Sequence, residues 1–290
     1  MCVQIKSALM LVLILSVHLA FAQETRPTVN PGQLVREVVF NELHDHQQHG
    51  FWRYWIKRHS SSGTNVEEQV ETAGGPVAWV ALGNGRPLSP GARMREQASL
   101  ARLLLSPDEQ ARHLHQYSQD EERIGRIVAL LPDAFLYTLD GEENGSYQLH
   151  FHPNPDFPPH STEERIFHAM SGTLWVDARS KRLAGLEGHI DENIDFGFGL
   201  LGRLYKGGWF RLRRVQVSAT EWKTAELEMH MNIRALLVTS FSRETSEVRG
   251  GFTPVPKGMT LAQGIVMLET PGPEPLPSDT QAPTPVALSR

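Results

Sequence analysis

The sequence predicts an α+β fold: a strongly curved antiparallel sheet, forming an open half-barrel, wrapped around helices. Three observations predict it. Apolar–polar alternation predicts short strands along much of the chain, two consecutive amphipathic helices interrupt them, and residues 170–217 place large aromatic residues among glycines. Because glycine removes side-chain bulk and tolerates bends or bulges, this mixture suits a sheet with strong curvature.

The first part of the body is predicted to be a helix followed by three strands. Residues 34–48 place apolar side chains on one helical face. Residues 51–58 are rich in aromatic residues and predict the first strand, and residues 66–72 and 77–82 predict a hairpin around the Gly-Gly pair between them.

Residues 89–131 are predicted to be a helical insertion. Ser-Pro pairs at 89–90 and 106–107 each supply an N-cap followed by proline at the first helical position. Pro132 is expected to end the second helix. Each helix carries one apolar stripe, so we expect the pair to cover a face of the sheet.

After Pro132 the periodicity changes to two. Residues 224–233 alternate most regularly, with apolar residues facing one way and polar residues the other, which predicts a strand buried on one side. The other predicted elements are strands at 135–139, 147–151, 173–176, 183–186, 210–217 and 235–241, and a closing helix at 261–268.

The N-terminus has the features of a secretory signal peptide. Lys6 precedes an apolar run over residues 8–17, and Ala20-Phe21-Ala22 matches the cleavage pattern, so cleavage is expected after Ala22. The run is too short to span a membrane. The expected mature protein is therefore exported to the periplasm and soluble.

The predicted organisation is a signal peptide at 1–22, one half-barrel-like domain at 23–270 and a disordered, Pro-rich tail at 271–290. The single cysteine, Cys2, lies within the signal peptide, which excludes a disulfide framework and thiol chemistry in the mature chain. The net charge of −5, with both signs mixed along the chain, gives no basic footprint for nucleic acid.

The motifs that could carry cofactor, metal or catalytic chemistry are weak. Residues 197–202 match G-x-G-x-x-G, but the residues that follow predict a strand instead of the helix that a dinucleotide site needs, so no cofactor is expected. His150 and His152 share one face of a strand, but no framework of three or four ligands accompanies them, so no metal is expected. The sequence contains no G-x-S-x-G elbow, so no catalytic residue is predicted and the protein is more plausibly a binding protein than an enzyme.

The aromatic residues among the glycines are the candidate ligand-binding residues. One interpretation is that they belong to an ordinary core; the other is that some line an apolar cavity between the concave sheet face and the 89–131 helices. The candidates are Trp175, Phe196, Phe198, Trp209 and Phe210.

The order of elements and the hairpin that begins Gly172-Thr173-Leu174-Trp175-Val176-Asp177 resemble the periplasmic half-barrel proteins of the LolA, LolB and RseB N-terminal type. The resemblance implies an apolar hollow that holds acyl chains or a lipoprotein signal. The expected function is thus non-catalytic, carrier-like binding of a lipid or lipidated protein. The alternatives are an envelope sensor or scaffold that binds a protein partner, and a secreted hydrolase or metal-binding protein.

Overall fold

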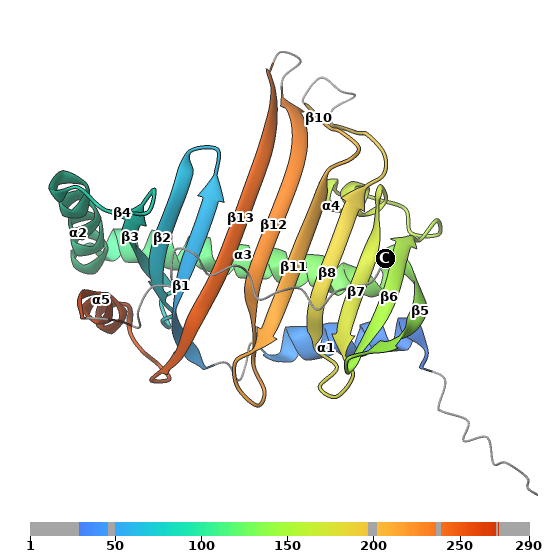
Figure 1. The fold of residues 1–290 in the computed structure, drawn as a ribbon, viewed down its shortest axis with the longest axis horizontal. Coiled ribbons are helices and arrows are strands. Elements are labelled where there is room, and N and C mark those ends of the chain that lie inside the picture. Colours follow the sequence, from blue (N-terminus) through green and yellow to red (C-terminus); the bar gives the residue numbers. More distant parts are fainter. Residues whose placement is uncertain (1–28, 46–49, 197–201, 236–238, 271, 273–290) are drawn as a thin grey trace, which may run out of the picture.

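A computed structural model describes residues 29–45, 50–196, 202–235, 239–270 and 272 (Figure 1). The predicted Phe198, the signal peptide and nearly all of the tail lie outside these residues. The elements are α1 (Pro31–Asp45), β1 (Phe51–Ser60), β2 (Gly63–Val70), β3 (Val77–Gly83), β4 (Arg86–Pro87), α2 (Pro90–Leu105), α3 (Pro107–Ala134), β5 (Phe135–Glu143), β6 (Ser146–Pro153), α4 (Thr162–Phe167), β7 (Met170–Asp177), β8 (Leu183–Ile190), β9 (Ile194–Phe196), β10 (Gly202–Leu204), β11 (Trp209–Gln216), β12 (Trp222–Ala235), β13 (Thr239–Val255) and α5 (Leu261–Glu269).

One antiparallel sheet contains all thirteen strands. Its main path runs β4-β3-β2-β1-β13-β12-β11-β8-β7-β6-β5, and β10 joins β12 to β9 beside this path. The sheet does not close into a barrel, because β4 and β5 remain as its two edges. The predicted fold class, an α+β protein built on an open antiparallel sheet, is confirmed.

The helices divide between the two ends and the inner face of this sheet. α3 runs behind the strands along the length of the sheet, from the β3 end to the β5 end, and α1 lies below it near β5 to β8 (Figure 1). The insertion predicted at 89–131 therefore does cover the sheet, but mainly through α3. α2 lies at the β3 end, where it contacts α3 and α5.

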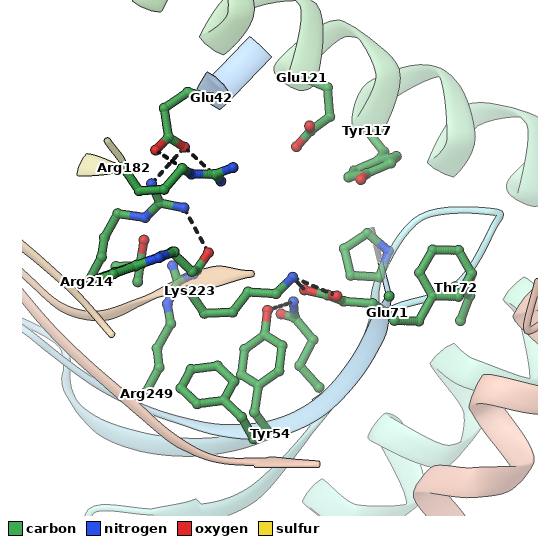
Figure 2. A pocket seen from close by; sticks show the side chains of 17 residues that line it. Glu42, Tyr54, Glu71, Thr72, Tyr117, Glu121, Arg182, Arg214, Lys223 and Arg249 are labelled. Atoms are coloured by element: carbon green, nitrogen blue, oxygen red, sulfur yellow. Dashed lines mark hydrogen bonds and ion pairs between the residues drawn. The ribbon is translucent and has the colours of Figure 1, made fainter. Parts of the chain in front are cut away.

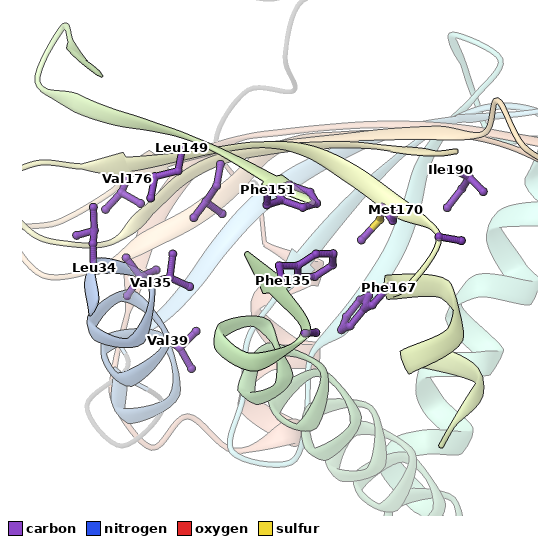
Figure 3. Packing of buried hydrophobic residues seen from close by; sticks show 14 of the residues in the cluster. Leu34, Val35, Val39, Phe135, Leu149, Phe151, Phe167, Met170, Val176 and Ile190 are labelled. Carbon is purple, nitrogen blue, oxygen red and sulfur yellow. The ribbon is translucent and has the colours of Figure 1, made fainter. Parts of the chain in front are cut away.

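A large apolar cluster fills the inner face at the β5–β8 end. α1 contributes four buried residues to it, and Phe135, Phe151 and Phe167 pack ring against ring with centroids 4.8–5.3 Å apart (Figure 3). The other buried members are Leu34, Val35, Val38, Val39, Ala134, Leu149, Ala169, Met170, Leu174, Val176, Ile190, Ile194 and Leu204.

Two paired glycines let aromatic rings lie against the sheet in this cluster. Gly172 and Gly188 are opposite each other on β7 and β8. A Cβ at Gly172 would collide with neighbouring backbone and with the ring of Phe151, and a Cβ at Gly188 would collide with the ring of Phe210. Aromatic rings thus do pack against glycines, as predicted, and this packing is centred on Gly172 and Gly188.

A second apolar cluster forms at the β2–β3 end, where Val70 and Val77 pack against Leu100 of α2 and Ile265 of α5. Since side chains alternate along β2, Val70 lies on the sheet face opposite to that of Gln69. The two ends of the sheet are thus stabilised by separate clusters.

Two predicted boundaries differ from the structure. α3 continues past Pro132 to Ala134, although Pro132 has no N–H to donate to the carbonyl four residues earlier. Asn154 donates to the carbonyls of Asp133 and Ala134, which satisfies acceptors at the end of the helix. The strand predicted at 235–241 is replaced by the long β13, which pairs with β1 as well as with β12. None of the described helices is both long enough and apolar enough to cross a membrane.

Candidate functional site

A cavity of about 410 Å³ lies on the inner face of the sheet, the face to which Gln69 points and opposite to that of Val70 and the second apolar cluster. Its floor comes from β1, β2, β12 and β13, and Tyr117 and Glu121 reach into it from the middle of α3 (Figure 2). Glu42, near the end of α1, and Arg182, just before β8, close one side. The cavity therefore collects residues from most of the length of the chain.

This cavity is charged, which corrects the expectation of an apolar hollow. Both cations and carboxylates line it, and most of them are largely buried. The charged lining residues are Glu42, Glu71, Glu121, Arg182, Arg214, Lys223 and Arg249. Of the aromatic residues expected there, Phe196 and Phe210 instead pack against the cluster at the β5–β8 end.

Glu42 organises the first group of charges. Its carboxylate accepts a hydrogen bond from Arg182 Nε at 3.1 Å and lies 2.7 Å from Arg214 Nη1. The side chains of Arg182 and Arg214 are only 8% and 13% exposed. Arg214 Nη2 also donates to the backbone carbonyl of Trp222 at 2.7 Å, so its guanidinium is held on two sides.

Glu71 organises the second group. Lys223 Nζ lies 2.8 Å from both of its carboxylate oxygens, and the backbone N–H of Trp52 donates to one of them at 3.2 Å. Burial raises the pKa of the Glu71 carboxyl, and this effect outweighs the opposing charge of Lys223. Gln69 donates to the hydroxyl of Tyr54, whose pKa is also raised by burial.

Irregularities in the strands coincide with the cavity. A bulge separates Arg213 from Arg214 in the β11–β12 ladder: Arg213 pairs with Glu226, whereas Arg214 turns to Glu42. The β1–β13 ladder shifts register next to Gly251, whose φ of 68° is the left-handed conformation that glycine adopts without strain. Bulges of this kind re-aim side chains and occur next to functional sites.

The middle of α3 passes over this cavity on the side opposite the sheet. The helix contacts α1, α2, α4 and β5, and its residues Tyr117 and Glu121 line the cavity. Burial and the nearby carboxylates raise the pKa of Tyr117 to about 12, so its hydroxyl stays neutral and able to donate. Leu114 and Ile124, on either side of the spanning segment, remain 44% and 51% exposed. α3 supplies the side of the cavity opposite the sheet through Tyr117 and Glu121.

The aromatic residues predicted to bind ligand are not brought together. Phe196 and Phe210 pack against the cluster at the β5–β8 end. Trp175 alternates with the buried Leu174 on β7 and so lies on the outer face, as does the 39% exposed Trp209, which stacks on His230 with ring centroids 6.4 Å apart. None of the described four lines the cavity, and their role in ligand binding stays a prediction.

Sequence reasoning missed the cavity because its charged residues are scattered singly. Glu42 follows an apolar helical face, Glu71 ends a strand, and Lys223 precedes the alternating strand. Each has the ordinary pattern of a surface charge. Only the pairing of β1 with β13 brings these segments together.

A cluster of Ser171, His189 and Asp191 on the outer face has the composition of a catalytic triad but not its geometry. Ser171 Oγ donates to Asp191 at 2.6 Å, and both Ser171 Oγ and Asp191 contact the same nitrogen, His189 Nε2, at 3.0 and 3.1 Å. A triad needs the carboxylate on the other ring nitrogen, so that Nε2 can accept the serine proton. These contacts therefore give no support to nucleophilic catalysis.

Comparison with known proteins adds little to this geometry. No protein-family model matches the sequence, and no curated protein matches it. Among solved structures, a DUF1329 family protein from Desulfovibrio piger is similar with a TM-score of 0.27 and 11% identity, covering 79% of this chain and 95% of that chain. A likeness with so low a TM-score supports no inference about this chain.

Proposed function

We propose that the protein is an exported, non-catalytic binding protein that holds a charged or strongly polar group of its ligand in the cavity beneath α3. Within this proposal, a lipid or lipidated partner would place its head group in the cavity. The mechanism differs from burial of an acyl chain, because ion pairs line the cavity in place of aromatic residues.

One observation carries the proposal: a set of largely buried ion pairs surrounds a hollow that the core does not fill. Removing charges from water costs several kcal/mol per ion, and replacing a buried pair by apolar residues is often neutral or stabilising. Stability therefore gives little reason to place these charges inside the fold. A site that recognises a polar ligand gives a direct reason, because such sites are concave and use a few well-placed polar groups.

The volume fits this role. Small-molecule sites typically enclose about 300–1,000 Å³, and the cavity lies within that range at about 410 Å³. The ion pair between Lys223 and Glu71 crosses the floor of the cavity, and α3 lies above it (Figure 2). A ligand carrying both donors and acceptors could be oriented by these groups.

Native mass spectrometry of the gently purified full chain, followed by extraction and identification of bound molecules, tests the proposal. Lys223→Met changes the cavity, and Arg211→Met is its matched control, since Arg211 is exposed and pairs with Glu187 and Glu228. The raised pKa of Glu71 favours a neutral carboxyl when Lys223 is removed, which helps the variant to fold.

We expect the unmodified protein and Arg211→Met to carry a bound molecule that Lys223→Met lacks, with all three giving the same circular dichroism spectrum. The proposal fails if no molecule is bound, or if Lys223→Met retains it fully. Turnover of the extracted molecule by the purified protein would contradict the non-catalytic part of the proposal.

A further inference from the structure

Two hydrogen-bond donors in the cavity lining lack partners. Among the described residues, four buried side-chain nitrogen atoms have no hydrogen-bond partner, and two of them, Trp222 Nε1 and Arg249 Nε, belong to residues that line the cavity. Leaving a buried donor unsatisfied costs about 1–3 kcal/mol, so native structures rarely do so without a reason. The two atoms therefore define what the cavity lacks.

Both atoms can only donate. The indole N–H has no acceptor capacity, and a guanidinium has five N–H donors and does not lose its proton in proteins. The missing partner must consequently supply acceptor oxygens. Arg249 Nη2 already donates to Glu247 at 2.8 Å, which fixes the guanidinium plane and leaves Nε for another acceptor.

The charges around these donors favour an acceptor with negative charge. Arg182, Arg214 and Lys223 line the same cavity as Arg249 and Trp222. Three carboxylates, those of Glu42, Glu71 and Glu121, line it as well, so the cations outnumber the carboxylates by four to three. Hydrogen bonds from cationic donors to an anion are roughly twice as strong as those between neutral groups, and a guanidinium matches the planar or tetrahedral oxygens of carboxylate and phosphate. A neutral ligand would gain less from the same donors.

We propose that the cavity binds an oxyanion, the phosphate or carboxylate group of its ligand, through Arg249 and Trp222. This inference rests on the proposed function and specifies the chemical class of the bound group. A free metabolite and the head group of an acidic phospholipid share this chemistry, and the experiment separates them.

Isothermal titration at low salt would compare three probes on the full chain: inorganic phosphate, dihexanoyl phosphatidic acid, and dihexanoylglycerol, which has the same acyl chains without the phosphate. We expect phosphatidic acid to bind and dihexanoylglycerol to bind at least tenfold more weakly. Competition by inorganic phosphate indicates that the oxyanion alone is sufficient, whereas absence of phosphate binding indicates that the lipid chains are also needed; either result supports an oxyanion site.

Two variants locate the binding. Trp222→Phe removes only the indole donor and keeps most of the ring, and Arg249→Met removes the guanidinium. The matched controls, Trp79→Phe and Arg211→Met, change residues that do not line the cavity. We expect affinity to fall about fivefold or more in Trp222→Phe and about tenfold or more in Arg249→Met, with both controls unchanged.

The inference is overturned if dihexanoylglycerol binds as tightly as phosphatidic acid, if phosphatidic acid and phosphate both fail to bind, or if Trp222→Phe and Arg249→Met leave the affinity unchanged. A neutral or cationic molecule that co-purifies with the protein and is lost in Lys223→Met would refute the oxyanion while leaving the proposed function intact. Trp222→Phe keeps the test decisive if Arg249→Met does not fold.

Discussion

The two halves of the inner sheet face are stabilised in different ways. At the β5–β8 end, α1, α3 and the strands close on a continuous apolar cluster with interlocking rings. At the centre, over β1, β2, β12 and β13, the same sheet and the same helix α3 enclose paired charges around a cavity. The apolar half accounts for much of the driving force for folding, so the charged half is free to serve recognition.

The largest expected loss of stability comes from a large-to-small substitution in the apolar cluster at the β5–β8 end. Phe151→Ala removes a ring that is 4% exposed and packs against Phe135. We expect the free energy of unfolding to fall by about 3–5 kcal/mol, because both transfer energy and packing are lost. Chemical denaturation measures the change. Leu136→Ala, at an exposed position of β5, is the control and should change it by about 0.5 kcal/mol or less. A loss below about 1 kcal/mol in Phe151→Ala would show that this half is not the principal core.

The next largest loss of stability is expected when the carboxylate charge of Glu42, which pairs with both Arg182 and Arg214, is removed. Glu42→Gln keeps the shape of the side chain but leaves Arg182 and Arg214 without their common carboxylate. We expect a loss of about 3 kcal/mol in the free energy of unfolding, the lower end of the range for a broken buried pair, since some solvent contact remains. Glu187→Gln, which breaks an exposed pair with Arg211, is the matched control and should lose about 1 kcal/mol at most. Equal effects of the two substitutions would remove the distinction between cavity and surface charges.

The pH dependence of stability should separate two carboxylates within the charged half. Burial alone would raise the pKa of Glu247, but hydrogen bonds and charges from Arg249 and Arg58 outweigh it, so the pKa is lowered from 4.5. Its contribution to stability is present above pH 4.5 and is lost as the pH falls through the folded-state value. Relative to Glu247→Gln, the unmodified protein should therefore become less stable as the pH falls below 4.5.

Glu71 should behave in the opposite sense, because burial raises its pKa above 4.5 in the folded state. Its contribution is fully present below pH 4.5 and is lost as the pH rises through the folded-state value. Relative to Glu71→Gln, the unmodified protein should lose stability as the pH rises above 4.5. Denaturant unfolding from about pH 3 to pH 7 measures both differences, and the same sign for the two would contradict this assignment.

The smallest effect is expected on the outer face. Arg211→Ala removes ion pairs with Glu187 and Glu228, whose side chains are all about half exposed. We expect the free energy of unfolding to change by less than about 1 kcal/mol, and the change to shrink further at high salt. A larger, salt-independent loss would mean that the outer ion pairs share the stabilising role assigned to the apolar half.

Local sequence patterns could predict most of the elements. The alternation at 224–233 predicted β12, and its polar positions Glu226 and Glu228 do face outward to Arg213 and Arg211. Ser89 and Ser106 cap α2 and α3, as the two Ser-Pro pairs predict. These features depend on residues a few positions apart, which is the range that sequence periodicity reports.

The cavity could not be predicted in this way, because it depends on which strands become neighbours. β1 pairs with β13, so Tyr54 and Phe252 become adjacent with ring centroids 5.1 Å apart. No spacing in the sequence encodes that pairing. The same limit explains Trp175 and Trp209: their aromatic character was visible, but the face on which they lie follows from the register of the sheet.

The distance along the chain between Glu42 and Arg182, 140 positions, has a consequence for how the protein becomes active. The lining also includes Arg249 and Phe252 of β13, so a fragment that lacks either end of the body loses part of the cavity. Recognition of a ligand would therefore begin only once synthesis and folding are complete. A bound molecule would then stabilise the whole domain by mass action. Only intact molecules would therefore bind the ligand, and partly degraded chains would be unable to compete for it.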